Sequence, residues 1–400
     1  MSSDTNSIES VHPLSRVPAQ FRREFGAAGV LVRSPGRVNL IGEHTDYNGG
    51  FVLPGAVDRA IYFSVGARDD GVCELAAADV GERVRVPLAS VTTSDKGWAN
   101  YLLGVVDEMQ KAGNSVPGFN CVFGGDVPIG AGLSSSAAIE AGLAFALNEL
   151  FAFGMQPWEL VKLAQRAENR FVGVQCGIMD QFANIFGRPD AVLRLDCRSL
   201  EFAAIPFSDR NLRIVLCDTG VRRALASSEY NIRRKQCQQG VEALQKQVGD
   251  IESLRDVSVA LLEEYRTALD PVTWRRCVYV ARENERVLAG CDDLARSDFT
   301  SFGRKLFASH EGLRDDYEVS CTELDRLVEI AAGVSGVLGA RMMGAGFGGC
   351  TINLVKSEAV DALREAVEQG YPPAREQRSF FHVIRIEGGT SRLESTDADQ

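Results

Sequence analysis

The chain has 400 residues, of which 45% are hydrophobic and 24% charged, so it can bury substantial cores and we expect two domains. A net charge of −11 and a pI near 5.1 argue against sequence-independent nucleic-acid binding, which requires clustered Lys and Arg side chains. The first ten residues lack the features of a signal peptide, no apolar run is long enough to cross a bilayer, and the ten cysteines follow no metal-ligand or disulfide pattern. We therefore expect a cytoplasmic protein with reduced, mostly buried thiols that binds neither nucleic acid nor membranes.

The first half of the chain combines strand-like and helix-like apolar patterns. Strand-like patterns cover residues 31–40, 51–65 and 119–123, with a helix near 99–112 before the last of them. Two further helices are predicted over 134–151 and 158–172. Because the first of these two is apolar on nearly every side, we expect it to be central and buried. Strands near 191–195 and 213–217 follow.

The second half is mainly helical from 227 to 327, with charged outer faces. Strands return at 336–342 and 350–355, followed by a helix near 357–369 and a last strand near 380–386. This order predicts an α+β fold with mixed α/β elements. We expect an N-terminal domain over residues 1–200, a C-terminal domain over 201–387 and a polar, flexible tail over 388–400.

Residues 36–50 concentrate polar chemistry in a glycine-punctuated turn, which reads Gly-Arg-Val-Asn-Leu-Ile-Gly-Glu-His-Thr-Asp-Tyr-Asn-Gly-Gly. Loops held by a packed scaffold commonly carry binding groups. Carboxylates beside an imidazole suit hydrogen bonds to a hydroxyl-rich ligand. A polar surface turn without a ligand has the same composition, so both interpretations stay open here.

Residues 128–138, Pro-Ile-Gly-Ala-Gly-Leu-Ser-Ser-Ser-Ala-Ala, join an apolar strand to the helix expected to be buried. Small residues let a ligand approach the backbone, and the first turn of a helix offers unpaired N–H groups and the positive end of the helix dipole. The segment therefore indicates a phosphate site. Serine N-capping of the helix is the alternative, although it requires only one serine. The segment is not a Walker loop, since no Gly-Lys-Ser or Gly-Lys-Thr follows.

Residues 344–349, Gly-Ala-Gly-Phe-Gly-Gly, satisfy the G-x-G-x-x-G spacing of dinucleotide-binding folds. A dinucleotide turn opens a helix, whereas residues 350–355 alternate like a strand. A glycine loop between two strands can lie over the phosphates of a nucleotide, or it can be a simple hairpin. The spacing alone does not decide between these two interpretations.

Two acids are flanked by apolar residues. Glu168 lies beside an apolar helical stripe, where a carboxylate requires a cation or a hydrogen-bond donor, and pairing with Arg166 or Arg170 would satisfy it structurally. Asp180, in the segment Gly-Ile-Met-Asp-Gln, is either a functional carboxylate or the cap of a short helix that ends at Gly187.

Together, these segments resemble in order and spacing the galactokinases of the GHMP kinase superfamily, over roughly residues 15–385. The 36–50 motif separates galactokinases from other members, whereas the two glycine motifs are shared across the superfamily. The resemblance implies a two-domain GHMP-kinase-like fold with the active site in the cleft between the domains. It also implies transfer of the ATP γ-phosphoryl group to the C1 hydroxyl of α-D-galactose. The products would be galactose 1-phosphate and ADP, in the first step of the Leloir pathway of galactose metabolism.

The resemblance further implies a role for each matched residue. Asp180 would be the catalytic carboxylate with Arg37 as its charged neighbour, and Ser136 and Glu168 would hold Mg²⁺. The residues implied to bind the sugar are Arg37, Glu43, His44, Asp46, Gly177, Asp180 and Tyr230. Those implied to bind ATP are Trp98, at the adenine, and Gly130, Ala131, Gly132, Leu133, Ser134, Ser135, Ser136, Ala137, Ala138 and Gly346.

These roles are chemically coherent, because phosphoryl transfer depends mainly on positioning and charge neutralisation. We expect Arg37 to keep Asp180 anionic, so that it can accept the sugar proton. Alternatives are a non-catalytic galactose and ATP sensor, an N-acetylgalactosamine kinase, and an NAD-dependent oxidoreductase that rests only on the 344–349 spacing. The sensors of this family have a damaged serine-alanine run, whereas residues 133–138 are complete here. The sequence leaves the oligomeric state open.

Overall fold

The computed structural model describes residues 12–26, 29–128, 132–221, 226–371 and 380–394. A six-stranded sheet forms the scaffold of its first half. All neighbouring strands in it are antiparallel except β4 and β6. The strand order is β13 (Ser391–Leu393), β1 (Val30–Asn39), β3 (Pro54–Ala67), β6 (Phe119–Gly125), β4 (Val72–Ala77) and β5 (Glu82–Pro87).

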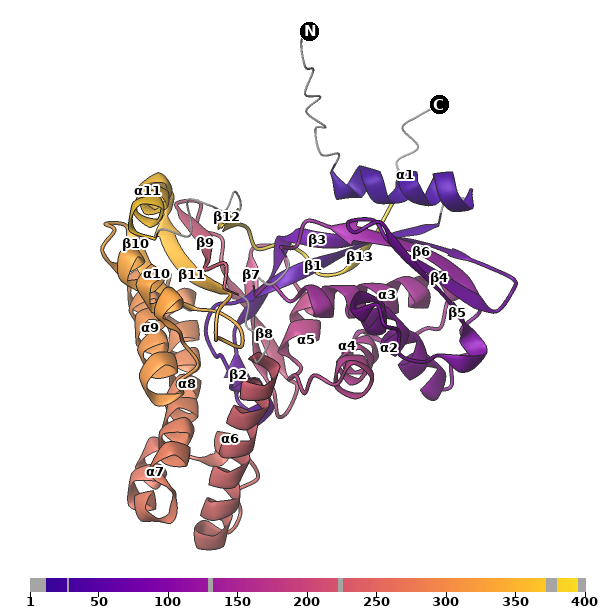
Figure 1. Cartoon of the computed structure of the whole chain (residues 1–400). Coiled ribbons are helices and arrows are strands. Elements are labelled where there is room, and N and C mark those ends of the chain that lie inside the picture. Colours follow the sequence, from indigo (N-terminus) through magenta and orange to yellow (C-terminus); the bar gives the residue numbers. More distant parts are fainter. Residues whose placement is uncertain (1–11, 27–28, 129–131, 222–225, 372–379, 395–400) are drawn as a thin grey trace.

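Helices cover both faces of this sheet (Figure 1). α1 (Pro13–Phe25) lies across one face, against β3 and β6. On the other face α3 (Ser135–Phe151) packs on β1 and β3, surrounded by α2 (Gly97–Lys111), α4 (Pro157–Arg166) and α5 (Met179–Phe186). The prediction of a central, buried helix is therefore confirmed, because α3 is enclosed by the sheet and three helices.

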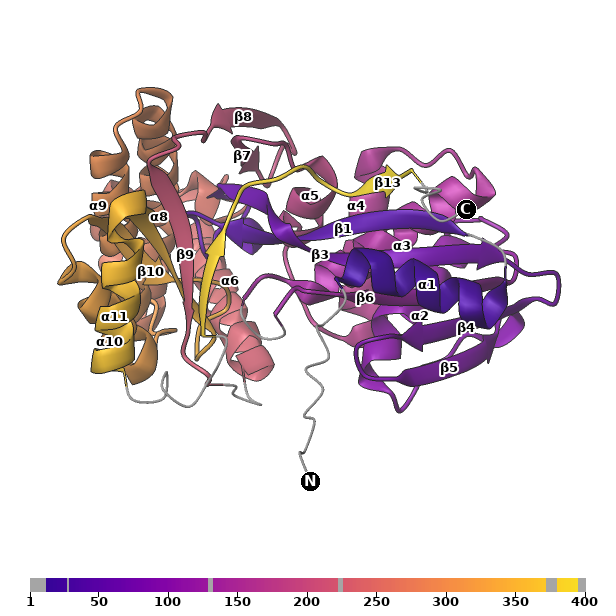
Figure 2. The ribbon, with the colours of Figure 1, turned by 90° about the horizontal axis from the view of Figure 1, so that it is seen from above.

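The second half contains a four-stranded antiparallel sheet beside the first (Figure 2). Its order is β10 (Val337–Met342), β11 (Cys350–Lys356), β9 (Leu212–Asp218) and β12 (Phe381–Ile384). The helices of this half are α6 (Ala226–Val248), α7 (Val259–Glu264), α8 (Pro271–Ala295), α9 (Phe299–Glu311), α10 (Thr322–Ala332) and α11 (Val360–Gly370). A small sheet of β2 (Phe51–Val52), β7 (Ala191–Asp196) and β8 (Phe202–Pro206) contacts α8 and therefore links the two halves.

The mixed α/β order is confirmed, but several elements differ from the prediction. The helix expected over 158–172 is α only to Arg166, and residues Ala167–Val172 form a π-helix. The expected tail over 388–400 was wrong for its first part, because Ser391–Leu393 pair with β1. A three-residue, polar edge strand has the composition of a tail. α1, β4, β5 and β8 were not predicted, and the division near residue 200 stays a prediction.

The cysteines match their prediction, since all ten are free thiols and eight of them are buried. None of the helices in the described ranges is both long and apolar enough to cross a membrane.

The packing of α3 on the sheet leaves no room for a side chain at Gly142. A methyl group added there would meet Phe63 Cε2 at 2.4 Å and Ser34 Cβ at 2.7 Å, whereas one added at Gly97, in the first turn of α2, would meet nothing within 4 Å. We expect Gly142→Ala to lower the free energy of unfolding by about 1–3 kcal/mol through overpacking. Gly97→Ala should leave it unchanged or raise it by up to about 1 kcal/mol. Urea denaturation measures both, and equal effects would contradict this account of the packing.

Candidate active site

Two adjoining cavities bring the predicted segments together between the two halves of the fold. The larger cavity, of about 380 Å³, lies between the N-terminus of α3 and the glycine loop 344–349. The smaller cavity, of about 200 Å³, is lined by the motif loop 42–50 together with Glu168, Gly177 and Tyr230. Both cavities are lined by Arg37, Asp180, Gly344 and Ala345, so these four residues form the wall that the cavities share.

Arg37 holds Asp180 in a two-pronged ion pair on this shared wall. Nε donates to Oδ1 and Nη2 donates to Oδ2, each at 2.8 Å. The third nitrogen, Nη1, donates to the carbonyl of Gly132, and the Arg37 backbone N–H donates to the Leu133 carbonyl at 3.0 Å. Burial is the largest single influence and lowers the pKa of Arg37, but the ion pair with Asp180, together with the charges of Glu43 and Asp46, outweighs it and raises the pKa. The guanidinium therefore fixes the catalytic candidate and the segment before α3 in one arrangement.

An irregularity in β1 places Arg37 at this point. The pairing of β1 with β3 shifts register between Pro35 and Arg37, as at a β-bulge. A bulge re-aims the side chain that follows it. A side chain at the intervening Gly36 would meet the Leu133 carbonyl oxygen at 2.9 Å, so the close approach of these two segments requires glycine there.

Ser134 and Asp180 do not cap helices through their side chains. Ser134 occupies the N-cap position of α3 with a left-handed backbone, φ +53°, and makes no capping hydrogen bond. Its hydroxyl donates instead to Asp180 Oδ2. Asp180 lies in the first turn of α5, and its carboxylate accepts from Arg37 and Ser134. Both residues thus face the cavities, and the capping alternatives for them were wrong.

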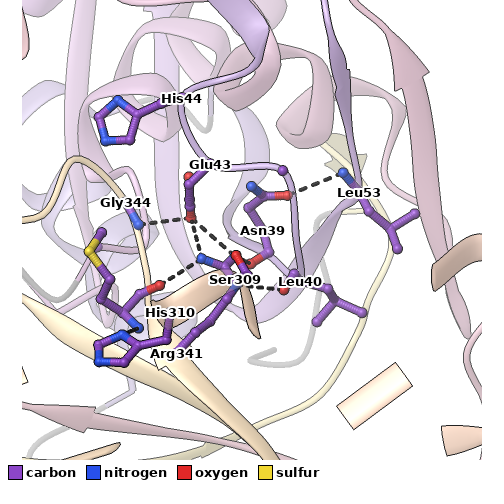
Figure 3. A network of polar contacts seen from close by, with 12 residues as sticks. Asn39, Leu40, Glu43, His44, Leu53, Ser309, His310, Arg341 and Gly344 are labelled. Carbon is purple, nitrogen blue, oxygen red and sulfur yellow. Dashed lines mark hydrogen bonds and ion pairs between the residues drawn. The ribbon is translucent and has the colours of Figure 1, made fainter. Parts of the chain in front are cut away.

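Glu43 and His44 of the motif loop line the smaller cavity, and Figure 3 shows both side chains. Both side chains are buried. Burial lowers the pKa of His44 to about 3, so its ring is neutral at physiological pH. Nε2 lies 3.2 Å from the Ala345 carbonyl and Nδ1 lies 2.8 Å from the Tyr47 hydroxyl. Because a carbonyl only accepts, the proton belongs on Nε2, and Nδ1 accepts from the tyrosine.

Asp46 lies directly against Gly177. A side chain at Gly177 would meet Asp46 Oδ2 at 1.7 Å, so this contact requires glycine. Burial, followed by the nearby negative charge of Asp180, raises the pKa of Asp46 to about 7. Tyr230, from α6, contacts His44 with its ring, at 5.4 Å between centroids. The polar residues of the motif loop and Tyr230 therefore surround one small polar space.

Glu168 projects from the π-helical segment and is not paired with its neighbouring arginines. Arg166 and Arg170 pair with Glu108 instead, at 2.7 and 3.6 Å. Glu168 accepts from Gln181 Nε2 at 2.8 Å. The structural explanation for this acid was therefore wrong, and π-helical bulges commonly place residues at functional sites.

Glu140 is a second buried acid beside Glu168, and the sequence motifs did not indicate it. Gln181 Nε2 lies 3.4 Å from Glu140 Oε2 and so bridges the two acids. Burial raises the pKa of both, and the partner carboxylate raises that of Glu140 further. The nearby Cys176 thiol, followed by the Ser136 hydroxyl, opposes the rise in the pKa of Glu168. Spacing offered one signal, because Glu140 follows Ser136 by four residues on a mostly apolar helix.

The remaining predicted nucleotide-binding residues fall into four groups. Gly132, Leu133, Ser134, Ser135, Ser136 and Gly346 line the larger cavity. Ala137 and Ala138 are buried in α3 behind it. Trp98 lines neither cavity and donates its indole N–H to Glu82 at 2.6 Å, so its role at the adenine stays a prediction. Gly130 and Ala131 lie outside the described residues. The walls also contain Val174, Cys176, Val221 and Met343, for which no sequence pattern gave a signal.

The glycine loop 344–349 connects the antiparallel neighbours β10 and β11. It is thus a hairpin loop, and it also closes one side of the larger cavity. Its position over the phosphates of a nucleotide stays a prediction. A strand follows it, so the dinucleotide-binding interpretation is excluded.

Comparisons with known proteins match nearly the whole chain. A model described as the galactokinase galactose-binding signature matches residues 19–67, the GHMP kinases N terminal domain matches 100–188, and the GHMP kinases C terminal model matches 292–373. A galactokinase of Roseiflexus sp. (strain RS-1) is 42% identical over 94% of this chain and 96% of its own length. The human galactokinase is 42% identical over 90% of this chain and 92% of its own length.

Solved structures agree with these matches. The structure of a Lactococcus lactis galactokinase complexed with galactose has a TM-score of 0.90 and 36% identity, and the match covers 95% of this chain and 100% of that one. A mevalonate kinase of Methanococcus jannaschii, at 17% identity and a TM-score of 0.64, shares the fold.

The raised pKa of Asp46 predicts a pH-dependent stability. The pKa of Asp46 is about 7 in the folded chain, above the ordinary 3.8. The folded chain therefore binds this proton more tightly than the unfolded chain, which stabilises the fold at low pH. This stabilisation is lost as the pH rises toward and through 7. Between pH 5 and pH 8, the wild type should lose more than about 1 kcal/mol of unfolding free energy relative to Asp46→Asn, since one pKa unit corresponds to about 1.4 kcal/mol.

Urea denaturation of the ligand-free proteins at both pH values measures this difference. Asp70→Asn is the control, because Arg68 lowers the pKa of Asp70 to about 2 and the group does not titrate in this range. A wild-type to Asp46→Asn difference that stays constant with pH would refute the assignment.

Proposed function

Because this chain belongs to the galactokinases of the GHMP kinase superfamily, which phosphorylate galactose with ATP, we propose that phosphoryl transfer takes place at Asp180, on the wall shared by the two cavities. The observation that carries this assignment is the Arg37–Asp180 ion pair, which contacts both cavities. An acid and a cation at the junction of two ligand spaces can act on both ligands at once.

The smaller cavity is proposed to hold galactose. Its polar groups come from Glu43, His44, Asp46 and Tyr230, which together offer donors and acceptors to several hydroxyl groups. With the sugar in this space, the C1 hydroxyl would lie toward Asp180. The glycine at position 177 lets Asp46 reach the ligand space, and this supports a role for the carboxylate in hydroxyl recognition.

The larger cavity is proposed to hold the ATP phosphates. The N-terminus of α3 borders it with free N–H groups and the positive end of the helix dipole, which attract phosphate. Loop 344–349 lies opposite, with left-handed backbones at Gly344, Gly346, Gly348 and Gly349. Such backbones favour glycine, and the absence of side chains leaves room for a triphosphate.

In the proposed reaction, the C1 oxygen of galactose forms a bond to the γ-phosphorus as the bond between this phosphorus and the β–γ bridging oxygen breaks. The hydroxyl proton passes to Asp180, and ADP leaves with the bridging oxygen. Arg37 holds both carboxylate oxygens at 2.8 Å and so fixes Asp180 for this transfer. Its charge also stabilises negative charge on the phosphoryl group as it moves.

Magnesium is proposed to bind between Ser136 and Glu168. Within the described part of the chain no group of three or more His, Cys, Asp or Glu side chains could hold a metal alone, so phosphate oxygens would complete the site. The local chemistry fits this ion. Glu140 Oε1 and Gln181 Oε1 are buried beside Glu168 without a hydrogen-bond partner. The candidate ligand atoms are all oxygens, which Mg²⁺ prefers. When bound, the ion supplies charge neutralisation for the β- and γ-phosphates.

Asp180→Asn tests the catalytic assignment. The amide keeps the size of the side chain but cannot accept the proton as a carboxylate does, so we expect kcat to fall by at least about 10²–10⁴-fold. ADP binding by calorimetry should stay within about threefold of wild type, a change of less than about 0.7 kcal/mol. ADP release with Mg-ATP and galactose measures turnover.

The matched control is Asp79→Asn, at a half-exposed carboxylate that pairs with Arg16 and lines neither cavity. Its turnover should equal that of the wild type. If Asp180→Asn retained turnover within tenfold of wild type, the acid would not be the essential proton acceptor.

A sugar panel of galactose, glucose, 2-deoxygalactose and N-acetylgalactosamine tests the proposed occupant of the smaller cavity. A site that hydrogen-bonds the axial C4 hydroxyl leaves buried polar groups unpaired when glucose binds, so we expect kcat/KM for glucose to be at least about a hundredfold lower. Comparable rates with both sugars would contradict the roles of Asp46 and its neighbours. Faster turnover of N-acetylgalactosamine would reassign the substrate, and sugar binding without ADP release would indicate a sensor.

A further inference from the structure

Arg341 is a fully buried arginine on β10 whose contacts reach the motif loop (Figure 3). Nε donates to the Leu40 carbonyl at 2.8 Å, and Nη2 donates to the Asn39 carbonyl. Nη1 donates to the Met342 carbonyl at 2.6 Å. Nη1 and Nη2 both lie 3.2 Å from Glu43 Oε1. The side chain thus joins the second sheet to the strand end and carboxylate of the motif.

Glu43 Oε1 also accepts the backbone N–H of Gly344 at 2.9 Å. One carboxylate oxygen therefore binds Arg341 and the first residue of the glycine loop together. Since Gly344 is only three residues from Arg341, the arginine fixes the start of this loop through β10 and again through Glu43. Displacement of Glu43 would release both contacts of its carboxylate.

A second contact joins the same two segments, because His44 Nε2 donates to the Ala345 carbonyl at 3.2 Å. Gly344 and Ala345 line both cavities, whereas Glu43 and His44 line the smaller one. The residues proposed to bind galactose are therefore hydrogen-bonded to the backbone that borders the proposed phosphate space.

We infer that Arg341 is a positioning residue that couples the binding of galactose to the binding of ATP, by locking Glu43 onto Gly344. The inference rests on the proposed occupants of the two cavities. A sugar that fixes Glu43 and His44 also fixes the carbonyl and N–H groups of the loop opposite the phosphates. Coupling of this kind is reciprocal, so nucleotide binding must tighten galactose binding by the same factor.

Arg341→Lys is the main test. Lysine keeps a positive charge next to Glu43, but one ammonium group cannot serve Leu40, Asn39, Met342 and Glu43 in the geometry of a guanidinium. We expect ADP to tighten galactose binding by at least about fivefold in the wild type, and by less than about twofold in the variant, against a usual range of about 5–150-fold for coupled sites. Calorimetric titration of galactose with and without saturating ADP gives both factors.

Arg33→Met is the control for a general loss of stability. Arg33 also holds two carbonyl oxygens, those of Gly388 and Val57 at 3.0 and 2.8 Å, but it lines neither cavity. Its coupling factor should equal that of the wild type. An equal coupling factor in Arg341→Lys and wild type would assign Arg341 a structural role only and overturn the inference.

Hydrogen exchange on the wild type provides a second test that needs no variant. Galactose alone should slow amide exchange in a peptide covering residues 343–350, because it fixes the acceptor of the Gly344 N–H. Unchanged exchange at saturating galactose would also overturn the inference. Failure of the proposed function looks different, since a wild type that neither binds nor phosphorylates galactose gives no coupling factor to measure.

Discussion

The buried carboxylate of Glu43 requires a compensating positive charge beside it. This requirement ties the two halves of the fold together. An uncompensated buried charge costs several kcal/mol, so the motif loop is stable in this form only with Arg341 beside it. α8 adds to this support, because Glu283 accepts the Gly42 N–H at 2.9 Å and the Tyr279 hydroxyl donates to the Glu43 carbonyl at 3.0 Å. Residues of the C-terminal half therefore hold in place the loop that presents polar groups to the smaller cavity.

Charge compensation also organises the wall that the two cavities share. Every nitrogen of the Arg37 side chain is used, two by Asp180 and one by the Gly132 carbonyl. The acid, the start of α3 and strand β1 are consequently in place before any ligand binds. Preorganised groups pay no reorganisation cost during the reaction, which is how fixed charges lower a phosphoryl-transfer barrier.

Local patterns were sufficient for most strands and helices and for the segments that form the cavities, because periodicity and glycine motifs are properties of neighbouring residues. They could not reveal Arg341, which meets Glu43 across 298 positions of sequence. Local patterns did not reveal the π-helical segment at Glu168 either. Regular α-helical spacing predicts which face of the helix a residue occupies, and the prediction fails where a π-helical turn inserts an extra residue. At Ser134 a tertiary contact overrules local propensity, because the partly buried carboxylate of Asp180 accepts the hydroxyl that capping rules assign to the helix.

The Arg37 ion pair also gives two nearby acids different surroundings. Asp180 receives both prongs of Arg37, which fixes its two carboxylate oxygens on the shared wall and suits the proposed proton acceptor. Asp46 lies against Gly177 with the charge of Asp180 nearby, and burial raises its pKa to about 7. Near neutral pH this carboxyl group can therefore both donate and accept, as recognition of a hydroxyl requires. These different environments support the proposed roles of Asp180 in proton transfer and of Asp46 in sugar recognition.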